Sequence, residues 1–236
     1  NMLRRYLLLL LIIFGIDGIQ GSKSPRMEEE IKISSIDVLT NDISDVNRWR
    51  YTIDRHMNFE PPPPDEHAQM ARYIVHNTDW TNMATISSHE KLAGHPFVNV
   101  FSFADGPTNQ STGIPYFYLT PLDVSTQDLM KHPAASLSMS LMQTSYCIDH
   151  NYDPESPLCA HVTLSGIFQK VDDPDELTFS RSALFSRHPE MADWPKDHQF
   201  YFAKFNISNI FLLDYFGGAK YVNITEYFNT DPLSSV

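Results

Sequence analysis

A long strand pattern near the carboxyl end constrains the fold of this chain more than any other feature. Across Phe200–Leu213 apolar side chains alternate with polar ones, and the alternation changes phase at Ser208–Asn209. A phase change in a long aromatic strand usually marks a β-bulge, which lets the strand bend around a closed sheet. Gly217–Gly218 then permits a tight turn. The pattern predicts a long curved strand within a barrel.

Shorter strand patterns come before it and complete an expected set of six strands. They are Met83–Ser87, Phe97–Phe103, Tyr116–Leu119, Ala135–Met142 and His161–Val171. The turn residues Asp105–Pro107 predict that the second and third of these strands form a hairpin. Helices are expected from Glu66 to Asn77 with Asp65 as the cap, from Ser125 to just before Pro133, and from Asp173 to at least Ser186. This order predicts a mainly β, α+β domain: a small antiparallel barrel with helices at its ends.

The first residues have the pattern of a secretory signal peptide. Arg4 and Arg5 precede eight apolar residues, Leu7–Phe14, and small residues follow as far as Gly21. The alternative is a membrane anchor, but the apolar run is well short of the ~20 residues that cross a bilayer. We therefore expect a signal peptide over 1–21, no transmembrane segment after its cleavage, and a secreted protein.

The rest of the chain divides by composition. Residues 22–65 are polar and end in four prolines, which predicts a linker or arm without a core of its own. The barrel domain is expected over 66–228 and a short tail over 229–236. The formal net charge is −12, which argues against a nucleic-acid partner.

Secretion makes three Asn-x-Ser/Thr sequons candidate glycosylation sites: Asn109, Asn206 and Asn223. Asn206 lies on the long strand and must point outward if it is used. The two cysteines, Cys147 and Cys159, either pair in the oxidising compartment or remain free buried thiols.

The sequence offers no clear catalytic or metal-binding pattern. The ten histidines lack the spacing that places two ligands on one helix face, and no strand–Gly-x-Ser-x-Gly–helix element is present. A flavin phosphate requires cations, yet no arginine occurs between Tyr73 and Ser180, and lysine occurs there only at positions 91, 131 and 170. We therefore expect no catalytic residue, no metal and no cofactor.

Several motifs nevertheless resemble a known superfamily. Met83–Ser87, Gly94–Phe97, Gly113–Leu119, Lys131–Leu137, Arg187–Glu190 and Asp214–Ala219 follow the order seen in FMN-binding split barrels of the pyridoxamine-phosphate-oxidase-like branch. Within it, the stretch from Tyr146–Cys147 through Asp153–Pro154 to Ser156–Cys159, together with Asp193–Pro195, is similar to the CREG family of secreted glycoproteins. These are named as cellular repressors of genes that an adenoviral early protein stimulates.

The resemblance implies a six-stranded antiparallel split β-barrel that forms a homodimer and in which a loop fills the flavin site. In this chain the loop is 151–157, and its pocket-filling residues are Asp153, Pro154, Glu155 and Ser156. It also implies a role in restraining growth and promoting differentiation. The cation-independent mannose-6-phosphate receptor is then a partner reached through the N-glycans, with Asn206 in the place where the family carries a sequon, and endolysosomal delivery follows.

Three hypotheses about function remain open at this stage. The first is a secreted or endolysosomal glycoprotein that acts by binding and is not an enzyme. The second is a flavin- or heme-type oxidoreductase of the split-barrel class, with FMN as the alternative cofactor. The third is a structural or storage glycoprotein.

Overall fold

A computed structural model describes residues 60–233 of the chain. The expected signal peptide, residues 22–59 of the expected arm and the last three residues of the tail lie outside the described part. The strands are β1 (Trp80–Ile86), β2 (Pro96–Ser102), β3 (Tyr116–Leu119), β4 (Ala134–Ser140), β5 (His161–Lys170), β6 (Tyr201–Leu213) and β7 (Lys220–Tyr221). The helices are α4 (His67–Asn77), α5 (Val124–Lys131), α6 (Tyr146–Asp149), α7 (Pro174–Arg187) and α8 (Ile224–Asn229), with short 3₁₀ turns η1 (Leu141–Gln143), η2 (Pro189–Asp193) and η3 (Lys196–His198).

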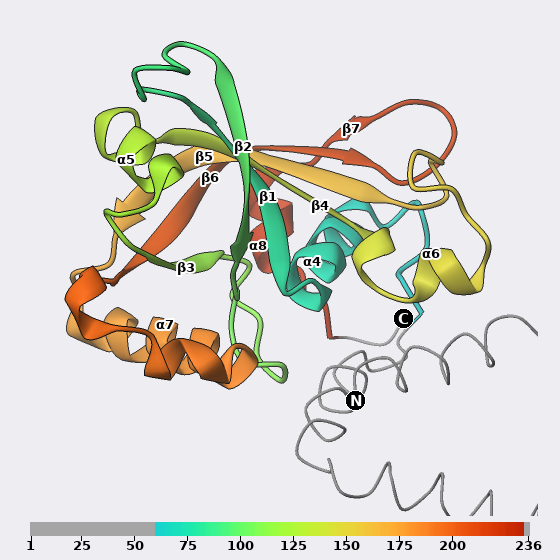
Figure 1. Cartoon of the computed structure of the whole chain (residues 1–236). Coiled ribbons are helices and arrows are strands. Elements are labelled where there is room, and N and C mark those ends of the chain that lie inside the picture. Colours follow the sequence, from blue (N-terminus) through green and yellow to red (C-terminus); the bar gives the residue numbers. More distant parts are fainter. Residues whose placement is uncertain (1–59, 234–236) are drawn as a thin grey trace, which may run out of the picture. The chain divides into compact units, whose positions relative to one another are not determined.

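The strands form one antiparallel sheet in the order β2-β1-β4-β5-β6-β3, and β7 is added beside β6 (Figure 1). The sheet curls until its two ends meet at a single backbone bridge between Ala104 and Tyr116. The predicted split barrel is therefore confirmed, but the predicted hairpin between β2 and β3 is wrong. Those strands are the opposite ends of the sheet, and β2 pairs with β1 whereas β3 pairs with β6.

The predicted bulge in β6 is present. Ser165 pairs with Asn209 and the next residue, Gly166, pairs with Ile207, so the register skips Ser208. Because one residue is extra at the bulge, Phe205 and Ile207 before it and Ile210 and Leu212 after it all face the core. In a regular strand of the same sequence, the last two would face outward. A Cβ on Gly166 would lie 2.1 Å from the backbone oxygen of Asn206, so the bulge requires glycine at this position.

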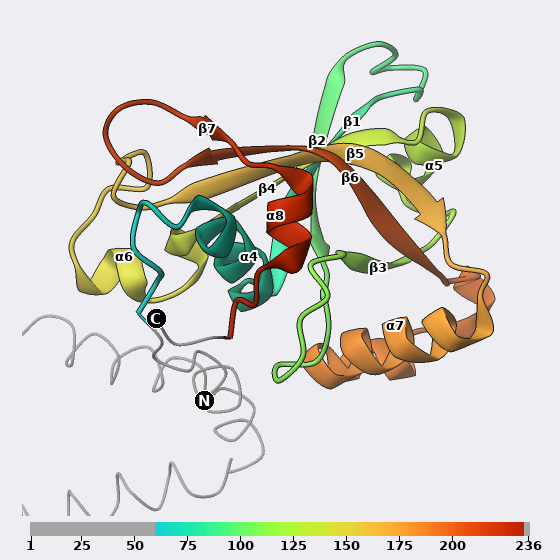
Figure 2. The same cartoon turned by 180° about the vertical axis from the view of Figure 1, so that it is seen from behind.

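The helices cover the concave side of the sheet and one part of its outer side. Figures 1 and 2 show α4 and α8 side by side beneath the sheet, where α4 buries Ile74 and Val75 in the main core. Helix α7 packs on the outer face of β3 and β6 and buries a second, smaller core around Tyr116 and Phe202. The barrel thus has a filled interior, as barrels of this size do.

Helix ends follow the sequence in most cases. Asp173 caps α7 by accepting a hydrogen bond from the backbone of Glu176, and Pro174 occupies the first turn, as expected. The predicted cap of α4 is wrong: Glu66 holds the capping position and makes no side-chain cap, and Asp65 lies in the preceding turn. Strand β7 and helices α6 and α8 are additions that the strand and helix patterns missed.

Candidate functional site

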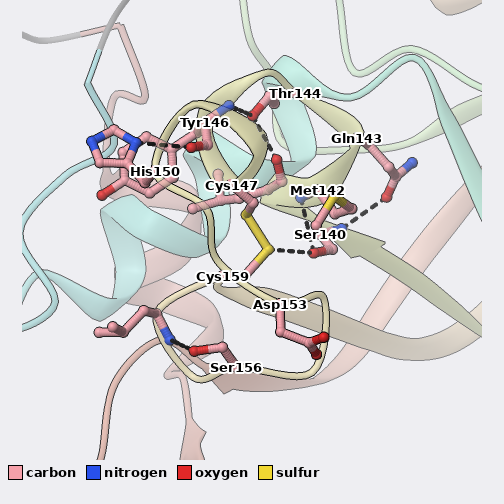
Figure 3. Close-up of a disulfide and its surroundings, with 12 residues drawn as sticks. Ser140, Met142, Gln143, Thr144, Tyr146, Cys147, His150, Asp153, Ser156 and Cys159 are labelled. Carbon is pink, nitrogen blue, oxygen red and sulfur yellow. Dashed lines mark hydrogen bonds between the residues drawn. A yellow bond between two sulfur atoms is a disulfide. The ribbon is translucent and has the colours of Figure 1, made fainter.

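The segment between β4 and β5 is built around the disulfide Cys147–Cys159 (Figure 3). The side chain of Ser140 caps η1, and the side-chain oxygen of Gln143 accepts a hydrogen bond from the backbone N–H of Ser140 at 2.8 Å. Both sulfur atoms are fully buried with the main core. The pairing alternative for the two cysteines therefore holds in this structure, and the disulfide closes the loop onto the barrel.

The loop residues expected to fill a flavin pocket are tied to one another. The carboxylate of Asp153 accepts from the backbone of Glu155 at 2.9 Å, and the hydroxyl of Ser156 accepts from the backbone of Leu158 at 3.3 Å. Asp153, Pro154 and Glu155 are exposed, whereas Ser156 is partly buried. Because three of the four are exposed, they do not fill the interior of this barrel. Their role in filling a flavin pocket therefore stays a prediction.

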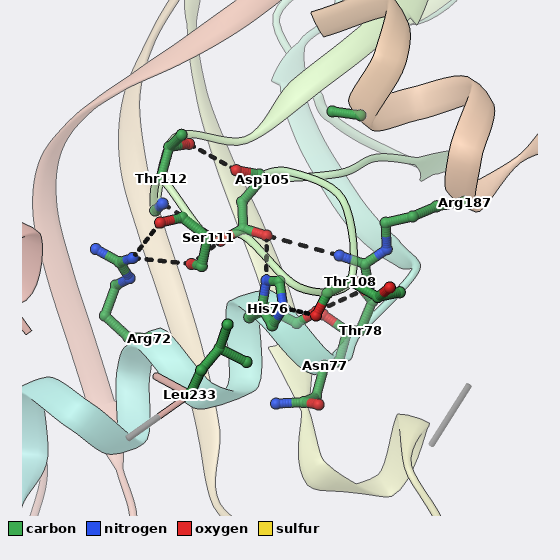
Figure 4. Close-up of polar contacts among 12 residues, drawn as sticks. Arg72, His76, Asn77, Thr78, Asp105, Thr108, Ser111, Thr112, Arg187 and Leu233 are labelled. Atoms are coloured by element: carbon green, nitrogen blue, oxygen red, sulfur yellow. Dashed lines mark hydrogen bonds and ion pairs between the residues drawn. The ribbon is translucent and has the colours of Figure 1, made fainter. Parts of the chain in front are cut away.

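A buried polar cluster lies on the other side of α4 (Figure 4). The Oδ1 atom of Asp105 lies 2.7 Å from Nδ1 of His76, and its Oδ2 accepts from the hydroxyl of Ser111. The Nε2 atom of His76 lies 3.1 Å from the backbone oxygen of Thr108. Both ring nitrogens therefore face acceptor oxygens inside the cluster, and Asp105 is completely buried.

Two buried arginines flank the cluster. Arg187 donates to the carboxylate of Asp79 at 3.0 Å and to the backbone oxygen of His76 at 2.7 Å, and its Nη1 lies 3.6 Å from Asp105. Arg72 donates to the hydroxyl of Ser111 at 2.8 Å and to its backbone oxygen at 3.1 Å. These roles of the two arginines were not predicted from the sequence. Arg72 lies in the middle of α4 and Arg187 at the end of α7, and neither position by itself indicates a buried arginine.

The Asp105 carboxyl is held in its charged form. Burial alone would raise its pKa, but the hydrogen bond and charge of His76, the charge of Arg187 and the hydroxyl of Ser111 outweigh burial and lower the pKa below its ordinary value. The pKa of a second buried acid, Asp128, is also lowered. Burial would raise this pKa, but hydrogen bonds from Ser88, Thr85 and Ser87 outweigh burial. Both acids tie loops to helices.

The Asp105 cluster does not have the geometry of a hydrolase. Nucleophilic catalysis requires a histidine that accepts the proton of the serine, with the acid behind the histidine. Here Ser111 donates directly to Asp105, and His76 is bonded to Asp105 and Thr108 instead. The cluster therefore fastens the loop that follows β2 to α4 and α7.

The cationic side chains also do not fit a flavin phosphate. A phosphate site needs donors aimed at open space, whereas Arg72 and Arg187 are 3% and 5% exposed and donate to groups within the fold. Two lysines on the barrel are paired: Lys204 with Glu176 at 2.7 Å and Lys170 with Asp172 at 3.2 Å. Within residues 60–233, these four cationic side chains are therefore engaged by other groups of the fold.

The three candidate glycosylation sites differ in their surroundings. Asn109 is exposed in the loop after β2. Asn206 lies on the outer face of β6, partly buried, and its Nδ2 atom donates to Gln169 at 2.9 Å. Asn223 caps α8 through its Oδ1 atom, which leaves its Nδ2 atom for a glycan.

None of the helices within residues 60–233 has the length and apolar character that a membrane span requires. No three His, Cys, Asp or Glu side chains of that part gather in a way that could hold a metal ion.

Comparisons with known proteins place the described domain among named relatives. A family model described as "CREG, beta-barrel" matches residues 62–229. Protein CREG1 of Gallus gallus is 52% identical over 173 residues, which are 72% of this chain and 90% of that protein. Protein CREG1 of Homo sapiens is 48% identical over 168 residues, covering 71% and 76%. Protein CREG2 of Homo sapiens is 42% identical over 172 residues, but the match spans 59% of its length.

Solved structures with the same fold are far less similar in sequence. A heme binding protein from Mycobacterium smegmatis superposes with a TM-score of 0.54 at 16% identity, covering 72% of this chain and 62% of that one. The protein Atu2129 from Agrobacterium tumefaciens gives a TM-score of 0.53 at 15% identity, covering 72% and 64%. At these identities the likeness concerns the fold alone.

Proposed function

The chain belongs to the CREG β-barrel family, and on that premise we propose that it is a secreted glycoprotein that acts by binding other macromolecules. Family membership supports the further proposal that it restrains growth and promotes differentiation. The partner proposed for its N-glycans is the cation-independent mannose-6-phosphate receptor, and endolysosomal delivery would follow from that binding. In this account the chain catalyses no reaction and holds no cofactor.

The outer face of the sheet is the observation that carries a binding role. The register of β2, β1, β4 and β5 shows which side chains of these four neighbouring strands lie on the outer face. They are Pro96, Val98, Val100 and Ser102 on β2; Trp80, Asn82, Ala84 and Ile86 on β1; Ala134, Ser136, Ser138 and Ser140 on β4; and His161, Thr163, Ser165 and Ile167 on β5. None of these sixteen is Asp, Glu, Lys or Arg, although the chain carries 46 such residues, 17 basic and 29 acidic.

Exposure on this face is high for apolar side chains. Val98 and Val100 are 59% and 60% exposed, and Ile86 and Ile167 are 49% and 50% exposed. A sheet face with small hydroxyl and aliphatic side chains and no charge is suited to packing against another protein surface. A second copy of the chain supplies a matching surface, because a two-fold interface brings the same patch together from both subunits. We therefore place the proposed homodimer here.

Light scattering of the purified protein tests the dimer. Val100→Lys introduces a charge on the uncharged face, and we expect it to convert a dimer into monomers. The matched control is Phe228→Lys, because Phe228 is 39% exposed on α8, which lies beneath the sheet and not on its outer face. A monomeric wild-type protein, or a Val100→Lys variant that remains dimeric, would contradict the placement.

A split-barrel oxidoreductase is the alternative, and the fold of the M. smegmatis heme binding protein is what favours it. The absorbance spectrum of the purified protein separates the two proposals. A colourless protein of dimer mass with glycan mass on Asn206 supports the binding glycoprotein. Flavin or heme absorbance in proportion to protein would favour the oxidoreductase.

A further inference from the structure

The sheet ends in an open edge at β2. This strand is the first in the order of the sheet, and it pairs on one side only, with β1. The backbone N–H of Phe103 donates to the backbone oxygen of Asp79 at 3.1 Å, in the register of that pairing. Because bonded and non-bonded pairs alternate in an antiparallel ladder, the odd-numbered residues of β2 bond to β1. The backbone groups of Val98, Val100 and Ser102 therefore point away from β1.

These outward backbone groups have almost no partners. Ala104, the next residue in the same phase, exchanges both backbone hydrogen bonds with Tyr116, where the barrel closes. Before that bridge, the outward groups form one hydrogen bond within residues 60–233, from the N–H of Val100 to Oδ1 of the adjacent Asn99 at 2.9 Å. Figures 1 and 2 show the β1–β2 hairpin extending beyond the rest of the sheet. The edge is therefore open to a strand from another chain.

Strand β2 also lacks the features that protect most sheet edges. Natural edge strands are usually very short or carry charged side chains. Strand β3, at the other end of the sheet, has 4 residues, whereas β2 has 7 and contains no Asp, Glu, Lys or Arg. Val98 and Val100 on β2 are 59% and 60% exposed. A long, exposed and apolar edge of this kind favours pairing with another strand.

The sequence of β2 is complementary to itself. Phe97–Phe101 reads FVNVF, a palindrome centred on Asn99. When two copies of β2 pair antiparallel about a two-fold axis at Asn99, Val98 lies opposite Val100 of the second copy. Both of these residues have outward backbone groups, so their N–H and C=O groups match as a bonded pair. The strand that fits this edge best is therefore β2 itself.

Charge also favours a second copy at this strand. The chain has a formal net charge of −12, so two copies repel each other and meet most easily where both surfaces are uncharged. We infer that the β2 edge binds the β2 edge of a second copy, so that one antiparallel sheet runs through both. The contact lies in the plane of the sheet and is separate from the outer face on which the homodimer is placed. It joins homodimers to one another, at higher concentration because an edge buries less surface than a face.

Light scattering of the purified full chain over a range of concentrations tests the contact. Val98→Pro removes an outward N–H that no hydrogen bond of the described residues uses, and proline is tolerated at such edge positions. The largest species of this variant should have about half the mass of the largest wild-type species, and the variant should melt close to the wild type. Val98→Thr is the matched control, because it keeps the N–H and the β-branched shape, and it should associate as the wild type does.

A cysteine at the centre of the palindrome tests the register. In the paired strands Asn99 faces Asn99 of the second copy, with Cα atoms about 4.5 Å apart, a separation that a disulfide spans. Since Cys147 and Cys159 bond to each other, Asn99→Cys adds a single free thiol. Mild oxidation should give a covalent dimer that dithiothreitol reverses. Met130→Cys is the control for random collisions, because Met130 is 68% exposed on α5, outside β2.

Three results would overturn the proposal. The first is an equal mass of the largest species in wild type and Val98→Pro. The second is the same loss of mass in Val98→Thr as in Val98→Pro, because the side chain and not the backbone would then make the contact. The third is a yield of covalent dimer from Asn99→Cys that is no higher than from Met130→Cys.

Discussion

The Nδ1 atom of His76 lies 2.7 Å from Oδ1 of Asp105, although 29 positions separate the two residues. One belongs to the last turn of α4 and the other to the loop that follows β2. Arg187, at the end of α7, donates to the backbone oxygen of that same histidine. One buried group of charges thus fastens two helices and a loop at the place where the barrel closes.

Asp105→Asn should destabilise the domain strongly. It leaves His76 without its buried anionic partner and removes the charge that lies 3.6 Å from Arg187, although Arg187 keeps its bond to Asp79. Breaking a buried pair costs about 3–5 kcal/mol. The measurement is the free energy of unfolding in urea. Asp172→Asn is the control, because Asp172 and Lys170 form a pair with side chains 75% and 62% exposed, and its effect should remain below about 1 kcal/mol. Equal losses in the two variants would show that the cluster does not hold the fold.

The pH dependence of stability should follow from the same acid. The pKa of Asp105 is lower in the folded chain than its ordinary value of 3.8, so its charge stabilises the fold above that value. This contribution is lost as pH falls below 3.8 through the folded pKa. Urea unfolding should therefore show a difference between wild type and Asp105→Asn that is constant from pH 7 to about 5 and shrinks below about 4. A difference that shrinks already between pH 7 and 6 would contradict this.

The bulge in β6 was predictable because it depends only on alternation within one strand. The break at Ser208–Asn209 is visible in the sequence, and the register confirms it. The pairing of β2 was not predictable from the turn chemistry of Asp105–Pro107, because turn residues describe local backbone only. Asp105–Pro107 belong to the loop between β2 and β3. The partners of these two strands, β1 and β6, depend on how the whole sheet closes.

The buried cluster was hidden from the sequence for a similar reason. Arg187 contacts the backbone of His76 across 111 positions, and such separations leave no periodicity to detect. The cysteine pair was a fair expectation because its members are 12 positions apart and flank one loop. The exposure of Asp153, Pro154 and Glu155 in that loop could not be predicted, because local composition does not tell which residues pack against them.

Deleting Ser208 should destabilise the domain. A regular strand would still turn Ile210 and Leu212 inward, where they are 1% and 0% exposed, but it would lose the local bend that the bulge gives β6 as the sheet curls. Circular dichroism and thermal melting of the variant provide the measurement. The control Ser208→Ala loses only the hydrogen bond to the backbone of Ser165 at 3.0 Å, worth ~1 kcal/mol. A deletion variant that melts like the wild type would refute the account of the bulge.

Asn206 should carry an N-glycan in the secreted protein. Its side chain is on the outer face of β6, and its amide bonds only to the exposed Gln169. Mass spectrometry should find Asn206→Gln lighter by one glycan, with melting close to that of the wild type. Asn223→Asp is a useful companion, because aspartate keeps the cap of α8 while it removes the sequon. An unmodified Asn206 peptide from secreted wild-type protein would contradict the prediction.

The most direct test is a titration of the purified secreted protein with FMN, followed by flavin fluorescence. We propose that the chain is a binding glycoprotein with a split-barrel fold, because its buried arginines are engaged within the fold and the uncharged face of its sheet is exposed. This proposal predicts that FMN fluorescence is unchanged by added protein. Saturable, stoichiometric quenching, one flavin per chain, would contradict it and make the protein a flavin-dependent oxidoreductase candidate.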